Sequence, residues 1–216
     1  MQTRPLGASG LHVSRLGLGT MSWGRDVEWA TARDLLHEFV AVGGNLVDTA
    51  PAYGAGVAEK MIGKALAGGL PRESLVIATK AGFVVRDGRR QIDTSRGALL
   101  NDLESSLRRL RTDHVDLWQV HAWGDAPIEE TLSAMDAAVA RGMARYVGVS
   151  NFVGWQTATA ATWQEADRTR TRLSSVQVEY SLLARRAEVE VVGAAAYHQL
   201  GLLAWSSLGR GVLPGS

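Results

Sequence analysis

The residues Gly44-Asn45-Leu46-Val47-Asp48-Thr49-Ala50-Pro51-Ala52-Tyr53-Gly54 predict a short buried strand that ends in an ionisable side chain. The apolar run that begins at Leu46 has the composition of a strand, and the Pro and Gly residues after it indicate a loop. This loop carries Tyr53, five residues after Asp48. We interpret the Asp and the Tyr as the beginning of an active site.

Two later strands also end in ionisable residues. The segment 75–80 ends at Lys80, and the segment 115–121 ends at His121. Groups that can give, take or stabilise a proton therefore follow three strands of the chain. Together Asp48, Tyr53, Lys80 and His121 have the composition of a proton-transfer site.

Strands and helices alternate along the whole chain. After a small hairpin in residues 1–14, strands are predicted to begin near residues 16, 45, 75, 115, 145, 175 and 201. A helix follows each of them except the last, and the strand that ends at Lys80 leads through a loop into its helix. This spacing of roughly 30 residues is typical of βαβ units with a parallel sheet. Helices are expected near 32–43, 58–66, 95–110, 127–142, 153–165 and 188–199.

Either a barrel or an open doubly wound sheet can be built from βαβ units. The dinucleotide fingerprint of the open sheet is missing, because Thr20-Met21-Ser22 follows Gly17-Leu18-Gly19 in place of a third glycine at the right spacing. Ionisable residues at several strand ends favour a (β/α)₈ TIM barrel, whose sites lie at that face. We therefore expect an α/β fold, with residues 1–216 forming one barrel domain.

The number of strands is one too few for a closed barrel. Eight strands typically need ~250 residues, whereas seven are predicted here before a Gly-rich tail at 208–216. We expect a barrel that is incomplete after its seventh strand. Its exposed edges would invite pairing with another chain, including a homo-oligomer.

The overall composition excludes several classes of function. A net charge of +1 gives no reason to expect nucleic acid or an anionic membrane as a partner. The chain has no cysteine, so disulfides, thiolate metal sites and a Cys nucleophile are excluded, and the histidines lack ligand spacing. No signal peptide is recognisable, and no apolar run approaches the ~20 residues of a membrane span. The expected location is the cytoplasm.

Several segments resemble the aldo-keto reductase family, in particular the branch that includes potassium-channel β-subunits and bacterial reductases. The first family signature is matched by residues 44–50 together with Tyr53-Gly54 and Glu59-Lys60-Met61-Ile62-Gly63. The second is matched by a stretch that begins with residues 106–110, continues with residues 113–117 and ends at His121. Segments 147–152, 177–183 and 205–211 resemble its nicotinamide-binding segments. The matches together extend over the whole chain.

The resemblance implies an NADPH-dependent carbonyl reductase with Asp48, Tyr53, Lys80 and His121 as its catalytic tetrad. Adding a hydride to a C=O group builds negative charge on oxygen, which needs an acid and hydrogen-bond donors. Tyrosine has a free pKa of about 10, and a neighbouring Lys80 ammonium is expected to lower the pKa of Tyr53. Asp48 would hold the lysine charged, and neutral His121 would donate a hydrogen bond to the carbonyl oxygen.

The resemblance also implies which residues bind the cofactor and a small carbonyl substrate. Ser150, Asn151 and Gln177 would contact the nicotinamide carboxamide, and Trp205 would stack on the nicotinamide ring. Trp23 and Trp123 follow strands one and four and would wall the substrate cavity with apolar surface, beside Tyr53 and His121. Further cofactor contacts are expected from Gly19, Thr20 and Met21 in the nicotinamide pocket, from Asp48, and from Ser206, Leu208 and Gly211 near the pyrophosphate.

The sequence departs from the family pattern in two places. Ser207 stands where the family usually has a proline, and Pro214 where a threonine is more common. The eighth strand and the basic segment that grip the adenosine 2′-phosphate are not recognisable. The choice between NADPH and NADH is therefore not fixed by the sequence.

Two rival functions fit parts of the same pattern. A lysine at a strand end can form a Schiff base in a lyase, which gives Lys80 a different role. A non-enzymatic NADPH-binding regulatory subunit, similar to the channel β-subunits, is the other rival. His121 favours the enzyme, because the sensor branch has a different residue there.

Overall fold

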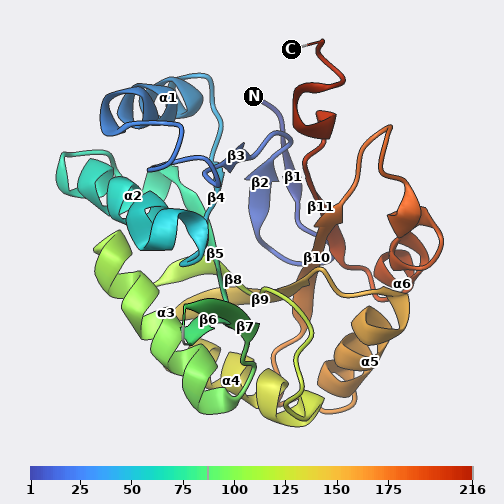
Figure 1. Ribbon diagram of the computed structural model, residues 1–216. Helices are drawn as coiled ribbons and strands as arrows, with labels where there is room; N and C mark the ends of the chain where they lie inside the picture. Colours follow the sequence, from blue (N-terminus) through green and yellow to red (C-terminus); the bar gives the residue numbers. More distant parts are fainter. Residues whose placement is uncertain (87, 216) are drawn as a thin grey trace.

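A computed structural model of the chain describes residues 1–86 and 88–215 (Figure 1). Ser216, the last residue of the predicted Gly-rich tail, thus lies outside the described residues. Alternating strands and helices follow a first hairpin, as the sequence predicts. Within the described ranges, no helix combines the length and the apolar character that crossing a lipid bilayer requires.

A parallel sheet of seven strands forms the centre of the fold. Its neighbours follow the order of the sequence, and every pair is parallel. A doubly wound sheet reverses its strand order at a switch point, so this order identifies the barrel type. The strands are β3 (Leu18–Gly19), β4 (Leu46–Asp48), β5 (Val76–Ala81), β8 (Val115–Val120), β9 (Ala144–Ser150), β10 (Leu173–Glu179) and β11 (Gly201–Trp205).

The sheet curls around a central axis, and the helices cover its outer face (Figure 1). In the described part of the chain β3 and β11 each pair on one side only, so the barrel is not closed. Each predicted helix is present, with the last one shortened by a preceding 3₁₀ turn at Arg186–Glu188. The helices are α1 (Trp29–Ala41), α2 (Val57–Ala67), α3 (Arg96–Leu110), α4 (Ile128–Ala140), α5 (Gly154–Glu165) and α6 (Val191–Tyr197).

The predicted N-terminal hairpin closes one end of the barrel. Its strands β1 (Thr3–Pro5) and β2 (His12–Ser14) are antiparallel. Leu6, Leu11 and Val13 are buried in one cluster with Leu46 and Val76, which lie at the starts of β4 and β5. This hairpin therefore seals the amino ends of the strands and leaves their carboxyl ends free for a site.

A second hairpin, β6 (Phe83–Arg86) with β7 (Arg89–Ile92), follows β5 where the sequence analysis placed only a loop. That interpretation was wrong because the hairpin lies outside the core and outside the strand–helix repeat: the apolar strand β6 is half-buried or exposed, and the mostly polar strand β7 is exposed. The sequence does carry a hairpin signal, since Asp87-Gly88 is a preferred two-residue turn pair. Asp87 itself lies outside the described residues.

Candidate active site

The pleat of the strands determines which side chains enter the barrel. In β5, Ile77 and Ala81 belong to the core beneath the helices, whereas Val76 and Ala78 belong to the inner cluster. Because side chains alternate between the two faces of a strand, Lys80 points inward with Val76 and Ala78. The same alternation turns Asp48 and Gln177 inward at the ends of β4 and β10.

Lys80 is the centre of the hydrogen-bond network at this end of the barrel. Its side chain has no exposed surface, and its Nζ lies 2.8 Å and 2.7 Å from the two carboxylate oxygens of Asp48. Nζ also donates to the Thr49 carbonyl at 3.2 Å and to the Tyr53 hydroxyl at 3.2 Å. Gln177 Nε2 donates to Asp48 Oδ1 at 2.8 Å. Asp48 of β4, Thr49 and Tyr53 of the following loop, Lys80 of β5 and Gln177 of β10 thus form one connected unit.

The loop after β4 turns Tyr53 back over Lys80. Gly54 and Gly56 have φ values of 55° and 86°, in the left-handed region that favours glycine. A Cβ on Gly54 would lie 2.8 Å from the Trp23 carbonyl oxygen, so this turn has no room for a side chain. The turn brings the Tyr53 ring within 6.2 Å of the His121 ring, nearly perpendicular to it.

The environment keeps Lys80 charged. Burial works against the ammonium, but the charge of Asp48, the Tyr53 oxygen and the hydrogen bonds to both together raise the pKa of Lys80 above its usual value. At neutral pH the Lys80 and Asp48 charges therefore balance each other inside the barrel.

The expectation that Lys80 lowers the pKa of Tyr53 is wrong for the net shift. Burial raises the pKa of Tyr53 above 10, and Asp48 adds to the increase; Lys80 acts in the opposite direction without outweighing them. Burial dominates because the phenolate would lose the solvation of water in this largely enclosed position. Tyr53 therefore stays protonated at neutral pH, in the form that can donate a proton.

His121 follows β8 and is buried, with 7% of its surface exposed. Burial, the Lys80 charge and the Arg90 charge lower the pKa of His121 to about 2. The Phe83 ring packs edge-on against the imidazole at 4.4 Å between ring centres. The imidazole is thus neutral, as the sequence analysis expected for a hydrogen-bond donor to a carbonyl group.

We expect His121 to make the folded chain acid-sensitive. Its folded pKa lies below the unfolded value near 6.5, so the stability it contributes is complete above about pH 6.5 and is lost as the pH falls. Between pH 7.5 and pH 5.0 the free energy of unfolding should fall about 2 kcal/mol less in His121→Asn than in the wild type. Urea unfolding at both pH values measures this difference.

The exposed His12 provides the control for this experiment. His12→Asn should retain the full pH dependence of the wild-type chain, because that ring lies on the surface of β2. Equal pH dependence in the wild type and His121→Asn would show that His121 titrates normally in the folded state.

The residues predicted to hold the nicotinamide also lie together. Asn151, just after β9 with φ 57°, donates from its backbone N–H to the Gln177 carbonyl at 2.8 Å. Its Nδ2 donates to the His121 carbonyl at 2.9 Å and to Ser150 Oγ at 3.1 Å. Trp205 Nε1 donates to Asn151 Oδ1 at 3.1 Å. This chain of hydrogen bonds joins the end of β11 to the residue that follows β8.

The remaining predicted cofactor residues lie at the ends of β3 and β11. Thr20 is fully buried and donates to the Asp48 carbonyl from both its backbone N–H and its hydroxyl, each at 3.0 Å, so it fixes the end of β4. Met21 is exposed, and Gly19 has open space where a Cβ would stand. Ser206, Leu208 and Gly211 lie in the segment that follows β11.

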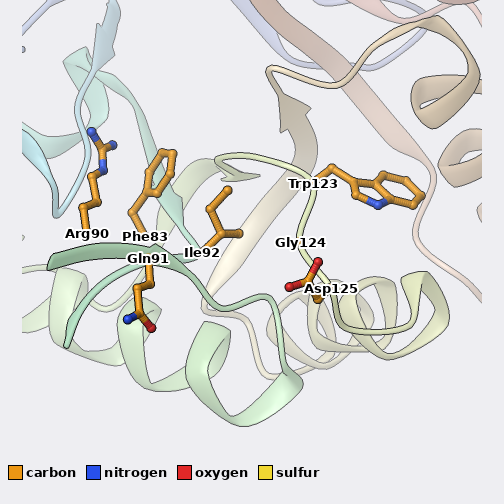
Figure 2. Close-up of a pocket in the computed structure, with 7 residues that line it drawn as sticks. All are labelled: Phe83, Arg90, Gln91, Ile92, Trp123, Gly124 and Asp125. Carbon is orange, nitrogen blue, oxygen red and sulfur yellow. The ribbon is translucent and has the colours of Figure 1, made fainter. Parts of the chain in front are cut away.

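The two tryptophans predicted to wall the substrate cavity have different positions. Trp123 is half-buried, contacts the Phe152 and Trp155 rings at 5.2 Å and 5.1 Å, and lines a cavity of about 610 Å³ (Figure 2). Trp23 is only 2% exposed and belongs to the core beneath the helices. The Trp23 expectation is therefore wrong, because the turn after Thr20 folds this ring inward.

The sequence analysis missed the residues that the β6–β7 hairpin adds. Phe83 reaches His121, and Arg90 stacks on Phe83 with 3.6 Å between the guanidinium carbon and the ring centre. Both residues line the cavity of Trp123. The Asp87-Gly88 turn pair was the signal that could have placed them at the site.

Comparison with known proteins gives consistent results. Residues 15–216 match the Aldo/keto reductase family. The chain is 41% identical over 226 residues to the Bacillus subtilis protein named "Uncharacterized oxidoreductase YrpG", covering all of this chain and 69% of the relative. It is 34% identical to "Aldo-keto reductase YhdN" of the same organism, covering all of this chain and 64% of the relative. A "Probable voltage-gated potassium channel subunit beta" of Oryza sativa is 36% identical, covering all of this chain and 66% of the relative.

Among solved structures, the aldo-keto reductase AKR11C1 from Bacillus halodurans in its holo form matches with a TM-score of 0.85. The sequence identity is 33%, over 99% of this chain and 68% of that one. The chain thus spans about two thirds of the length of these relatives. With the family match over nearly all of its residues and a parallel barrel-type sheet, the chain belongs to the aldo/keto reductase family.

Proposed function

We propose that this protein is an oxidoreductase that reduces an aldehyde or ketone to an alcohol with NADPH, with Tyr53 as the general acid. The observation that carries the proposal is the convergence of a protonated Tyr53, a charged Lys80 and a neutral His121 at one end of the barrel. A carbonyl oxygen that gains negative charge needs these three kinds of group.

Each residue of the tetrad has a distinct task in the proposed reaction. Tyr53 gives its proton to the carbonyl oxygen as negative charge develops there. Lys80, 3.2 Å from the Tyr53 oxygen, stabilises the phenolate that remains. Asp48 holds the Lys80 ammonium by two hydrogen bonds. Neutral His121 donates a hydrogen bond that orients the carbonyl group.

The residues near the ends of β9, β10 and β11 have chemistry that suits a nicotinamide cofactor. When bound, NADPH supplies the hydride that the carbonyl carbon receives. The Ser150 hydroxyl and the Asn151 and Gln177 amides can pair with a carboxamide, and Trp205 offers a flat, half-exposed ring. Among the described residues, Gln177 Nε2 is engaged with Asp48, whereas no hydrogen bond engages its Oε1.

The Schiff-base rival fits this geometry poorly. A lysine must be neutral to attack a carbonyl carbon, whereas Lys80 is paired with Asp48 and its pKa is raised. The Lys80 Nζ also directs its hydrogen bonds to four oxygens of Asp48, Thr49 and Tyr53. We therefore assign Lys80 an electrostatic role in place of a nucleophilic one.

A titration with NADPH, followed by tryptophan fluorescence, tests the proposal on the 216-residue chain. We expect saturable quenching that is largely lost in Trp205→Ala, together with aldehyde-dependent oxidation of NADPH. Trp163→Ala is the matched control, because this tryptophan stacks on Arg170 away from the proposed site. Absence of both quenching and oxidation would overturn the proposal.

A regulatory nucleotide-binding subunit is the second candidate, favoured by the similarity to the plant protein named as a channel β-subunit. In that case NADPH should quench the tryptophan fluorescence, and adding an aldehyde should not lead to oxidation of the NADPH. The same titration therefore separates the two functions.

A further inference from the structure

The two faces of the β6–β7 hairpin differ in the direction of their side chains. Phe83 pairs with Ile92 and Val85 with Arg90 in the antiparallel register, so these four residues share one face. Figure 2 shows Arg90, Phe83 and Ile92 rising from the same side of the hairpin, whereas Gln91 points the opposite way. By the same alternation Arg89 lies on the face of Gln91.

The face with Arg90 is the one that meets the catalytic residues. Phe83 contacts His121 with 4.4 Å between ring centres, and His121 contacts Tyr53 at 6.2 Å. Phe83, Arg90 and Ile92 also line the cavity of about 610 Å³ that Trp123 borders, together with Gln91 of the opposite face. A molecule whose carbonyl group lies at Tyr53 and His121 would therefore extend past Phe83 toward Arg90.

The Arg90 guanidinium is held against a ring and, among the described residues, not by a carboxylate. It stacks on the Phe83 ring, and it forms no ion pair with a carboxylate of residues 1–86 and 88–215, whereas Arg86 of the same hairpin is paired with Asp93. Stacking on a ring leaves the N–H groups in the guanidinium plane available. This arrangement suits the two parallel hydrogen bonds that arginine makes to a carboxylate.

The charged groups of the tetrad do not offset the positive charge of Arg90. Asp48 and Lys80 neutralise each other, and His121 is neutral, so these three residues add no net charge next to the cavity. Asp125 lines the same cavity but stands beside Trp123 at the other end (Figure 2). A positive field at Tyr53 and His121 would attract an anionic substrate.

We propose that the carbonyl substrate carries a carboxylate, and that Arg90 binds this group and thereby determines specificity. The inference rests on the proposed function, because it assigns the substrate class of the same site. Burial, Lys80 and Arg90 together lower the pKa of His121, which agrees with a guanidinium within electrostatic reach of the reacting groups.

Binding of compounds that cannot react tests the inference without requiring catalysis. The NADPH-loaded chain should bind 4-carbamoylbenzoate at least tenfold more tightly than neutral terephthalamide, measured by calorimetry. Arg90→Met should lose this difference. Arg89→Met should keep it, because Arg89 lies on the other face of the hairpin. Equal binding of the two compounds by the wild-type chain, or an unchanged difference in Arg90→Met, would overturn the inference.

Turnover then distinguishes the substrate class from the function itself. The ratio of kcat/KM for 4-carboxybenzaldehyde to that for 4-formylbenzamide should fall about tenfold or more in Arg90→Met and remain unchanged in Arg89→Met. If neither aldehyde is reduced while Arg90-dependent carboxylate binding persists, the proposed function fails and the anion site stands. If both are reduced with a ratio that Arg90→Met leaves unchanged, the inference fails and the function stands.

Discussion

Replacing Tyr53 by Phe should lower kcat for aldehyde reduction by about 10²- to 10⁴-fold, the range that a positioned general acid contributes. The variant loses the hydroxyl that Lys80 contacts at 3.2 Å and keeps the ring that packs near His121. The proposed cofactor residues do not depend on this hydroxyl, so the dissociation constant for NADPH should change by less than threefold. Steady-state kinetics and the fluorescence titration measure the two quantities.

Tyr197 offers a matched control for Tyr53, because it is a tyrosine on α6 with 83% of its surface exposed. Tyr197→Phe should keep the wild-type kcat and the wild-type NADPH affinity. If Tyr53→Phe retains more than a tenth of the activity, Tyr53 is not the proton donor.

Replacing Lys80 by Met should destabilise the fold by about 3–5 kcal/mol, the typical result of removing one partner of a buried ion pair. The Asp48 carboxylate would then remain inside the barrel, and among the residues that the structure describes only the Gln177 amide would be left as a side-chain partner. The expected loss is a large part of the 5–15 kcal/mol by which proteins are usually stable. Urea unfolding at neutral pH measures the change.

Two further variants show whether the unpaired charge causes the loss. Removing both charges in Lys80→Met with Asp48→Leu should recover most of the stability, since paired apolar replacements are often neutral. Lys60→Met, at an exposed lysine of α2, should change the stability by less than about 0.5 kcal/mol. A double variant as unstable as Lys80→Met alone would contradict this explanation.

The sequence predicted the barrel strands and the grouping of Asp48, Tyr53, Lys80 and His121 because both depend on local patterns. Strands such as Gly201–Trp205 consist of apolar residues and glycine, and the four candidate catalytic residues lie near strand ends or in the loop that follows. Strand alternation then fixes the inward direction of Asp48 and Lys80, so their meeting follows from the order of the strands.

Other features depend on three-dimensional surroundings that the sequence does not display. The Tyr53 pKa is raised because burial outweighs Lys80, and burial is a property of the packed barrel. Trp23 follows a strand in sequence, yet its turn folds it into the core. The β6–β7 hairpin is short and none of its described residues is buried, so the strand–helix repeat of the core gives no sign of Arg90 beside the site.

The hydrogen bond between Gln177 and Asp48 has a consequence for how the site assembles during folding. It joins residues 129 positions apart, whereas the strands of the sheet each pair with the next parallel strand along the chain. Pairings between strands that are close in sequence form early. Contacts of long sequence separation form late, because closing the long loop costs conformational entropy before the contact contributes any stabilisation. During synthesis, Lys80 and Asp48 can meet while the ribosome still holds the later strands, but the carboxylate gains its amide partner only once β10 has emerged.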